Sequence, residues 1–181
     1  KIFYAPSCLR KNPKSNQTVL LYVKNTEETE LLGKYLAQAL VSTNPVQTLL
    51  FKGTLGSGKT TLVRSLVQHL PGGDEAEVSS PSFNVYNLYP TTPETAHYDL
   101  YRLAGGCVDE SFYELLDEEQ TLMLVEWAEH LPEREYPNEW LQFSWIPCEE
   151  GRQIDILVKG AGATRVIEAL KPLVTSMQVA P

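Results

Sequence analysis

The chain has 181 residues, a length that suits one substantial hydrophobic core and is short for two. Hydrophobic residues make up 43% and charged residues 21%, and every apolar run falls short of the ~20 residues that span a bilayer, so the composition indicates an ordinary globular domain. The net charge of −8 argues against a large direct nucleic-acid surface, because neutralising phosphates requires clustered Lys and Arg.

The ends of the chain and its cysteines bear on location and domain limits. Residues 1–17 carry a small basic cluster beside two prolines and several polar residues and lack the apolar core of a signal peptide, so we expect a flexible tail. The 3 cysteines are odd in number and contain no C-x-x-C pair, which favours reduced thiols and a cytoplasmic protein. We expect a single domain over residues 18–176 and a short C-terminal tail over 177–181.

The first predicted elements lead to a glycine-rich loop. Residues 18–23 are strand-like, and Asn25 followed three residues later by Glu28 is typical of a helix start. The apolar residues that follow recur at helical spacing, and residues 47–52 then read as a short buried strand.

Gly53-Thr54-Leu55-Gly56-Ser57-Gly58-Lys59-Thr60 fills the pattern G-x-x-x-x-G-K-[ST] of a phosphate-binding loop. Its glycines let backbone N–H groups converge on a polyphosphate, Lys59 can reach the β- and γ-phosphates, and the Thr60 hydroxyl can ligate Mg²⁺. Apolar residues at helical spacing follow the loop, so the phosphates would lie at the helix N-terminus. The order strand, loop, helix predicts a site for a nucleoside triphosphate; the alternative is a glycine-rich turn between core elements.

The later elements complete one domain. In chain order they are an antiparallel pair of strands at 83–89 and 95–101, a helix at 109–119, a buried strand at 121–127, a hairpin at 141–145 and 154–158, and a helix at about 162–174. The predicted fold is α/β, a single P-loop NTPase-like domain with a mixed β-sheet flanked by helices.

Two carboxylates are candidates for chemistry at this site. Glu126 ends an apolar strand in the manner of a Walker B motif, which would aim it at the metal; alternatively it only starts a turn. Asp99 lies in an apolar and aromatic strand, where an unpaired charge is costly. It either orients a water or contacts Mg²⁺, or it pairs with nearby Arg102. His97 shares its face, although a lone histidine there is more often structural.

The loop after the P-loop helix and the hairpin turn add weaker candidates. Ser80 and Ser82 occupy the position where P-loop proteins often carry a switch segment that senses the γ-phosphate. Their hydroxyls could reach Mg²⁺ or water, or the segment is an ordinary loop. Arg152 could reach the nucleotide from the hairpin turn, although exposed turn arginines are common.

With these residues placed, the chain resembles the TsaE (formerly YjeE) family, the bacterial ATPases of tRNA threonylcarbamoyladenosine biosynthesis. The resemblance covers roughly residues 18–160. Asp-Leu-Tyr-Arg followed by Val-Glu-Trp is its most specific part, whereas the P-loop alone is generic. The motifs that carry it are the P-loop, Ser80-Pro81-Ser82-Phe83, His97-Tyr98-Asp99-Leu100-Tyr101-Arg102-Leu103, Leu124-Val125-Glu126-Trp127 and the helix beginning near Thr29.

The resemblance implies ATP and Mg²⁺ as cofactors and a role for each matching residue. Asp99, Glu126 and Lys59 would be catalytic, Thr60 and Glu126 would hold the metal, and Ser80 and Ser82 would form the switch. The implied ATP-binding residues are Thr26, Leu55, Gly56, Ser57, Gly58, Lys59, Thr60, Thr61, Gly151 and Arg152.

The resemblance also implies partners. These would be TsaD and TsaB subunits, which transfer threonylcarbamoyl to an adenosine beside the anticodon and which ATP hydrolysis would reset between turnovers. The tRNA would be held mainly by the partners, in agreement with the acidic charge.

Three residues depart from the family pattern, which usually has Asp at Thr54, Ala at Ser57 and Thr at Ser82. Ser57 is a small change, and Ser82 keeps a hydroxyl but loses the methyl that stiffens χ1. Thr54 removes a carboxylate beside the phosphates, which bears on hydrolysis rate and metal affinity more than on binding.

Two other functions stay open on the sequence. A small-molecule P-loop kinase would need several arginines to clamp the transferred phosphoryl group, and here the arginines are scattered. A nucleotide-gated binding subunit with negligible turnover of its own is the non-enzymatic alternative. A GTPase is disfavoured because no N-K-x-D motif occurs.

Overall fold

Seven strands form one mixed sheet in the order β1-β7-β6-β2-β5-β4-β3. The computed structural model describes residues 18–43, 47–81, 86–103, 107–118 and 120–178. The strands are β1 (Thr18–Val23), β2 (Thr48–Lys52), β3 (Tyr86–Tyr89), β4 (Glu94–Asp99), β5 (Thr121–Glu126), β6 (Trp140–Pro147) and β7 (Arg152–Lys159). The helices are α1 (Thr26–Ser42), α2 (Lys59–His69), α3 (Glu110–Asp117) and α4 (Ala161–Leu170), and the 3₁₀ turns are η1 (Tyr101–Leu103), η2 (Ala128–His130), η3 (Glu133–Glu135) and η4 (Thr175–Met177).

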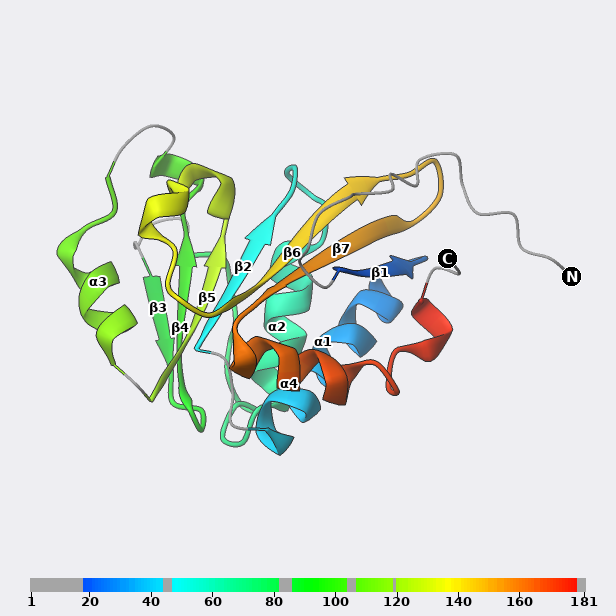
Figure 1. Cartoon of the computed structure of the whole chain (residues 1–181), viewed down its shortest axis with the longest axis horizontal. Helices are drawn as coiled ribbons and strands as arrows, with labels where there is room; N and C mark the ends of the chain where they lie inside the picture. Colours follow the sequence, from blue (N-terminus) through cyan, green and yellow to red (C-terminus); the bar gives the residue numbers. More distant parts are fainter. Residues whose placement is uncertain (1–17, 44–46, 82–85, 104–106, 119, 179–181) are drawn as a thin grey trace, which may run out of the picture.

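The central strands run parallel and the edges antiparallel. β2 pairs in parallel with β5 and β6, and β5 pairs in parallel with β4, whereas β3, β7 and β1 join as antiparallel strands. In Figure 1, α1, α2 and α4 gather on one face of the sheet, and α3 lies on the other. The predicted α/β domain with a mixed sheet flanked by helices is therefore confirmed.

Alternation along the strands assigns each side chain to one of two cores. Leu122 and Leu124 of β5 belong to the core beneath α1, α2 and α4, whereas Met123 and Val125 pack toward α3. Glu126 continues the first set, so its carboxylate is directed to the face of the sheet that α2 covers. The alternation along β5 thus determines that the Glu126 carboxylate faces α2.

Side-chain contacts set several element boundaries. Asn25 Oδ1 accepts a hydrogen bond from the backbone N–H of Glu28 at 2.9 Å, as the predicted helix start requires. The strand expected to reach residue 101 ends at Asp99, because Asp99 Oδ1 accepts from the N–H of Tyr101 (2.9 Å) and turns the chain into η1. This corrects the predicted extent of that strand.

Other boundaries differ by a few residues. The last helix ends at Leu170 rather than near 174, two residues before Pro172. Beyond it Met177 is buried and Gln178 forms a bridge with Leu21, so packed chain continues past residue 176. The expected tail at 1–17 and residues 83–85 of the predicted strand lie outside the described residues. No helix within the described segments is long and apolar enough to cross a membrane.

Close packing of α1 on α2 fixes the helix that carries the P-loop. A Cβ at Gly33 would lie 2.8 Å from the carbonyl oxygen of Leu62, so only glycine permits this approach. The Ser65 hydroxyl donates to the carbonyl oxygen of Glu30 at 2.6 Å and ties the two helices together. The helix that begins at the P-loop is therefore held closely against α1.

Candidate functional site

The glycine-rich loop lies between β2 and α2, as predicted. Gly58 caps α2 with φ of 110°, and Gly56 has φ of 73°, values in the left-handed region that side chains rarely adopt. A Cβ added at Gly56 would meet nothing within 4 Å, so the loop backbone is open on that side. Leu55 at its tip is 80% exposed, whereas Ser57 is buried with its Oγ unpartnered among the described residues.

The Lys59 ammonium lies inside the loop. Its Nζ donates to the carbonyl oxygens of Gly53 (2.7 Å) and Thr54 (3.0 Å) and stands 4.0 Å from the centre of the Trp127 ring. Burial lowers the pKa of Lys59, and three carboxylates, those of Glu126, Glu129 and Asp99, oppose this shift. The positive charge of Lys59 is thus supported by negative charges on β4, β5 and η2.

Glu126 lies directly beneath the start of α2. Its Oε2 accepts a hydrogen bond from the Thr60 hydroxyl at 2.9 Å, and its Oε1 lies 3.0 Å from Nε2 of His97. The Glu126 side chain is 2% exposed and His97 is fully buried. The carboxylate therefore has a hydrogen-bond partner on each oxygen.

Asp99 lies beside Glu126 in the β4–β5 register. Its Oδ2 accepts from the Ser80 hydroxyl and its Oδ1 from the N–H of Tyr101 at 2.9 Å. The Ser80 contact ties the segment after α2 to this carboxylate. The two predicted acids thus stand next to each other, each held by different neighbours.

The oxygen atoms at this point suit a small divalent cation. A hydroxyl and a carboxylate are hard donors of the kind that Mg²⁺ prefers, and Mg²⁺ is commonly held by one or two protein ligands together with phosphates and water. The described residues contain no group of three or more His, Cys, Asp and Glu side chains that could hold a metal by themselves. Thr60 and Glu126 therefore fit a metal shared with a bound polyphosphate.

A cavity of about 230 Å³ adjoins the loop and gathers the remaining predicted contacts. Its lining includes Thr26 and Thr61 from the two helix starts, and Gly151 and Arg152 from the β6–β7 turn. A Cβ at Gly151 would lie 2.6 Å from the carbonyl oxygen of Val23, so glycine allows the hairpin turn to approach β1. Residues far apart in the sequence thus form one wall beside the P-loop.

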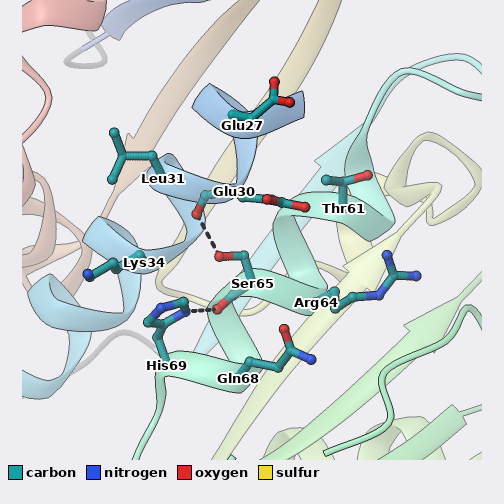
Figure 2. A pocket seen from close by; sticks show the side chains of 9 residues that line it. All are labelled: Glu27, Glu30, Leu31, Lys34, Thr61, Arg64, Ser65, Gln68 and His69. Carbon is teal, nitrogen blue, oxygen red and sulfur yellow. Dashed lines mark hydrogen bonds between the residues drawn. The ribbon is translucent and has the colours of Figure 1, made fainter. Parts of the chain in front are cut away.

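A larger hollow of about 340 Å³ lies between α1 and α2 (Figure 2). Its lining mixes acidic and basic side chains, and Figure 2 shows hydrogen bonds from Ser65 to Glu30 between the two helices and between His69 and Ser65 within α2. Of the predicted site residues it contains only Thr61. Because this hollow presents no glycine loop, the smaller cavity is the stronger candidate for a nucleotide site.

Glu129 is a site residue that sequence reasoning missed. Its Oε1 accepts from the N–H of Gly53 at 3.3 Å and so contacts the first residue of the loop. No local sequence pattern predicts this contact, because it depends on the conformation of the turn that follows β5. Ser82, the second predicted switch hydroxyl, lies outside the described residues.

A glycine loop between a parallel strand and a helix, with a carboxylate at the end of the adjacent strand, defines a P-loop NTPase-type protein. The model of the family described as "Threonylcarbamoyl adenosine biosynthesis protein TsaE" matches residues 23–154. The chain therefore belongs to the TsaE family, and the resemblance inferred from its motifs is confirmed.

Individual relatives agree with this membership. A TsaE protein of Rickettsia felis is 41% identical over 114 residues, covering 61% of this chain and 63% of the relative, and one of Aquifex aeolicus is 33% identical, covering 59% and 74%. The chain thus spans less than two thirds of the Rickettsia felis protein. The crystal structure of Bacillus subtilis YdiB superposes with a TM-score of 0.65 and 25% identity, covering 88% of this chain and 98% of that one.

Proposed function

We propose that this protein is a Mg²⁺-dependent ATPase subunit of the tRNA threonylcarbamoyladenosine modification machinery. It hydrolyses ATP to ADP and phosphate, and this resets a transferase complex of TsaD and TsaB subunits between turnovers. The observation that carries the proposal is the pairing of Thr60 with Glu126 beneath a P-loop in a chain of the TsaE family. Relatives of the chain are named as tRNA threonylcarbamoyladenosine biosynthesis proteins.

In this proposal ATP lies along the loop and into the adjacent cavity. The N–H groups of the loop and of the first turn of α2 bind the phosphates, and Lys59 exchanges its two carbonyl partners for phosphate oxygens. Thr26, Thr61 and Arg152 line the cavity that takes the rest of the nucleotide.

The two acids have separate tasks. Thr60 and Glu126 hold Mg²⁺, which when bound offsets the negative charge of the phosphates. Asp99 orients the attacking water, because its carboxylate stands beside Glu126 and is steadied by Ser80 and by the N–H of Tyr101. Water activation near the γ-phosphate is thereby linked to the segment that contains Ser80.

The acidic charge of the chain supports the assignment of tRNA to the partner subunits. With a net charge of −8, the protein is poorly suited to neutralise an RNA backbone alone. We place its work in the cytoplasm, where tRNA is modified.

The test is Mg²⁺-dependent ATP hydrolysis by this protein, alone and with purified TsaD and TsaB subunits, in a reaction that contains tRNA and follows modified adenosine over many turnovers. We expect hydrolysis to rise with the partners and modification to stall when this protein is omitted. Lys59→Ala is the negative control, because it removes the loop cation.

Other outcomes would favour the two alternatives. Transfer of phosphate to a small acceptor, or hydrolysis indifferent to the partners, would favour a small-molecule kinase. Stimulation of modification by bound nucleotide without turnover would favour a nucleotide-gated binding subunit.

A further inference from the structure

His97 is a buried polar residue to which the proposed mechanism gives no task. It lies on β4 with a fully buried side chain, and its neighbours on this face of the sheet include Leu122 and Leu124. Its Nε2 reaches Oε1 of Glu126 at 3.0 Å. A packing role alone would be served better by an apolar side chain, so the imidazole calls for another explanation.

The hydrogen-bond partners of His97 define its tautomer. An ionised carboxylate only accepts hydrogen bonds, so in this contact Nε2–H of His97 is the donor and Oε1 of Glu126 the acceptor. Nδ1 has no partner among the described residues, although it is buried. An unpartnered buried nitrogen costs free energy. The arrangement therefore favours one contact, that with Glu126, at the expense of local stability.

The two hydrogen bonds on Glu126 differ in character. Thr60 lies at the first turn of α2, and its hydroxyl is itself an oxygen donor suited to a metal. His97 comes from a strand that is paired on both sides, with β3 and with β5, so it cannot turn away easily. When the Thr60 hydroxyl serves another partner, His97 still holds the carboxylate.

We propose that His97 is a positioning residue: its Nε2–H holds Oε1 of Glu126, so that Oε2 is directed toward Thr60 and the metal site. This inference rests on the proposed function, in which Thr60 and Glu126 share Mg²⁺. Residues that orient metal ligands in this way typically alter metal affinity or activity by about 10–100-fold when replaced.

The test compares two amide replacements of similar polarity. In His97→Gln the amide nitrogen can occupy the place of Nε2, whereas in His97→Asn it reaches only the place of Nδ1 and leaves Glu126 without this donor. The measurement is ADP affinity by calorimetry, with and without Mg²⁺. Thr95→Val is the matched control, because it removes a buried hydroxyl on the same face of β4 that bonds Thr91 at 2.7 Å and not Glu126.

We expect His97→Asn to reduce the gain in ADP affinity that Mg²⁺ confers by about 10–100-fold, with Mg²⁺-free ADP affinity unchanged. His97→Gln should keep most of the gain, and Thr95→Val should lower only the melting temperature. Equal losses in the Gln and Asn variants, or no loss in either, would overturn the positioning role. If the unaltered protein shows no Mg²⁺-dependent gain at all, the proposed function fails, and this inference fails with it.

Discussion

The ammonium of Lys59 stands 4.0 Å from the centre of the Trp127 ring, while its hydrogen bonds go to the carbonyl oxygens of Gly53 and Thr54. Trp127 adopts the left-handed conformation with φ of 57°, the only non-glycine residue of the described segments to do so. This turn places the indole against the loop immediately after Glu126. The aromatic ring thus lies against the ammonium that the loop encloses.

Trp127 should report the movement of Lys59. If phosphates draw the ammonium away from the ring, the surroundings of the indole change, and tryptophan fluorescence should change when ADP is added. The chain has 3 tryptophans, so the assignment needs variants. We expect Trp127→Phe to lose most of the response and Trp140→Phe to keep it. An unchanged response in Trp127→Phe would show that the signal comes from another tryptophan, such as Trp145 beside Gly53 and Gly58, and would contradict the assignment of the response to Trp127.

Ser80 should matter for turnover more than for binding. Its hydroxyl donates to Asp99, and hydrogen bonds to charged groups contribute about 1.5–3 kcal/mol. We expect Ser80→Ala to lower kcat about tenfold or more, with the KM for ATP little changed. Ser79→Ala, a change at the exposed neighbouring serine, is the control in the same kinetic assay. Equal kcat values in the two variants would show that the Ser80 hydroxyl does not contribute to hydrolysis.

The Gly151 turn should be needed for the wall of the nucleotide cavity. An alanine there would bring a Cβ within 2.6 Å of the Val23 carbonyl oxygen at φ of 67°, which costs about 1–3 kcal/mol in backbone strain. We expect Gly151→Ala to lower both the melting temperature and ADP affinity. Gly72→Ala is the matched control, because it meets the Pro90 carbonyl at 2.8 Å in a turn away from the cavity. Gly72→Ala should lower the melting temperature without lowering ADP affinity. An equal loss of ADP affinity in the two variants would contradict the assignment of Gly151 to the wall of the nucleotide cavity.

Tyr98 should make stability depend on alkaline pH. Burial raises the pKa of Tyr98 to about 12 from 10.0, and its hydroxyl lies 3.1 Å from that of Ser111. Between these values the phenol ionises in the unfolded chain but stays neutral in the folded one, so stability is full below pH 10 and is lost as pH rises toward 12.

A phenylalanine at this position removes that dependence. At about pH 11 the unaltered protein should have lost about 1.4 kcal/mol through Tyr98, whereas Tyr98→Phe loses nothing through this residue. Urea unfolding of both proteins at about pH 9 and pH 11 measures the difference. A difference in unfolding free energy between the two proteins that stays constant with pH would show that the pKa of Tyr98 is the same in the folded and unfolded chain.

The sequence was informative where the chemistry is local. The P-loop spacing fixes its own backbone, and the apolar run before Glu126 predicted a buried strand beside it, so the Thr60–Glu126 pairing follows from adjacent parallel strands. The end of β4 could not be predicted, because the strand pattern continues to residue 101 while Asp99 captures the N–H of Tyr101.

Contacts between segments that are distant in the sequence could not be predicted from a single sequence. The bond between His97 and Glu126 depends on the β4–β5 register, and that between Glu129 and Gly53 depends on the turn after β5. The approach of Gly151 to Val23 likewise needs the β6–β7 turn placed against β1. Periodicity predicts which elements form, whereas these pairings are set by how the elements pack.

Phosphate release by Glu126→Gln in the presence of Mg²⁺, ATP and the partner subunits tests the site most directly. The amide preserves the volume of the side chain but removes the negative charge beside Thr60. We expect Mg²⁺-free ATP to bind nearly as before and phosphate release in the presence of Mg²⁺ to fall by about 10²-fold or more, and Asp99→Asn to behave similarly. Release at the unaltered rate in both variants would contradict the assignment of this site to ATP hydrolysis.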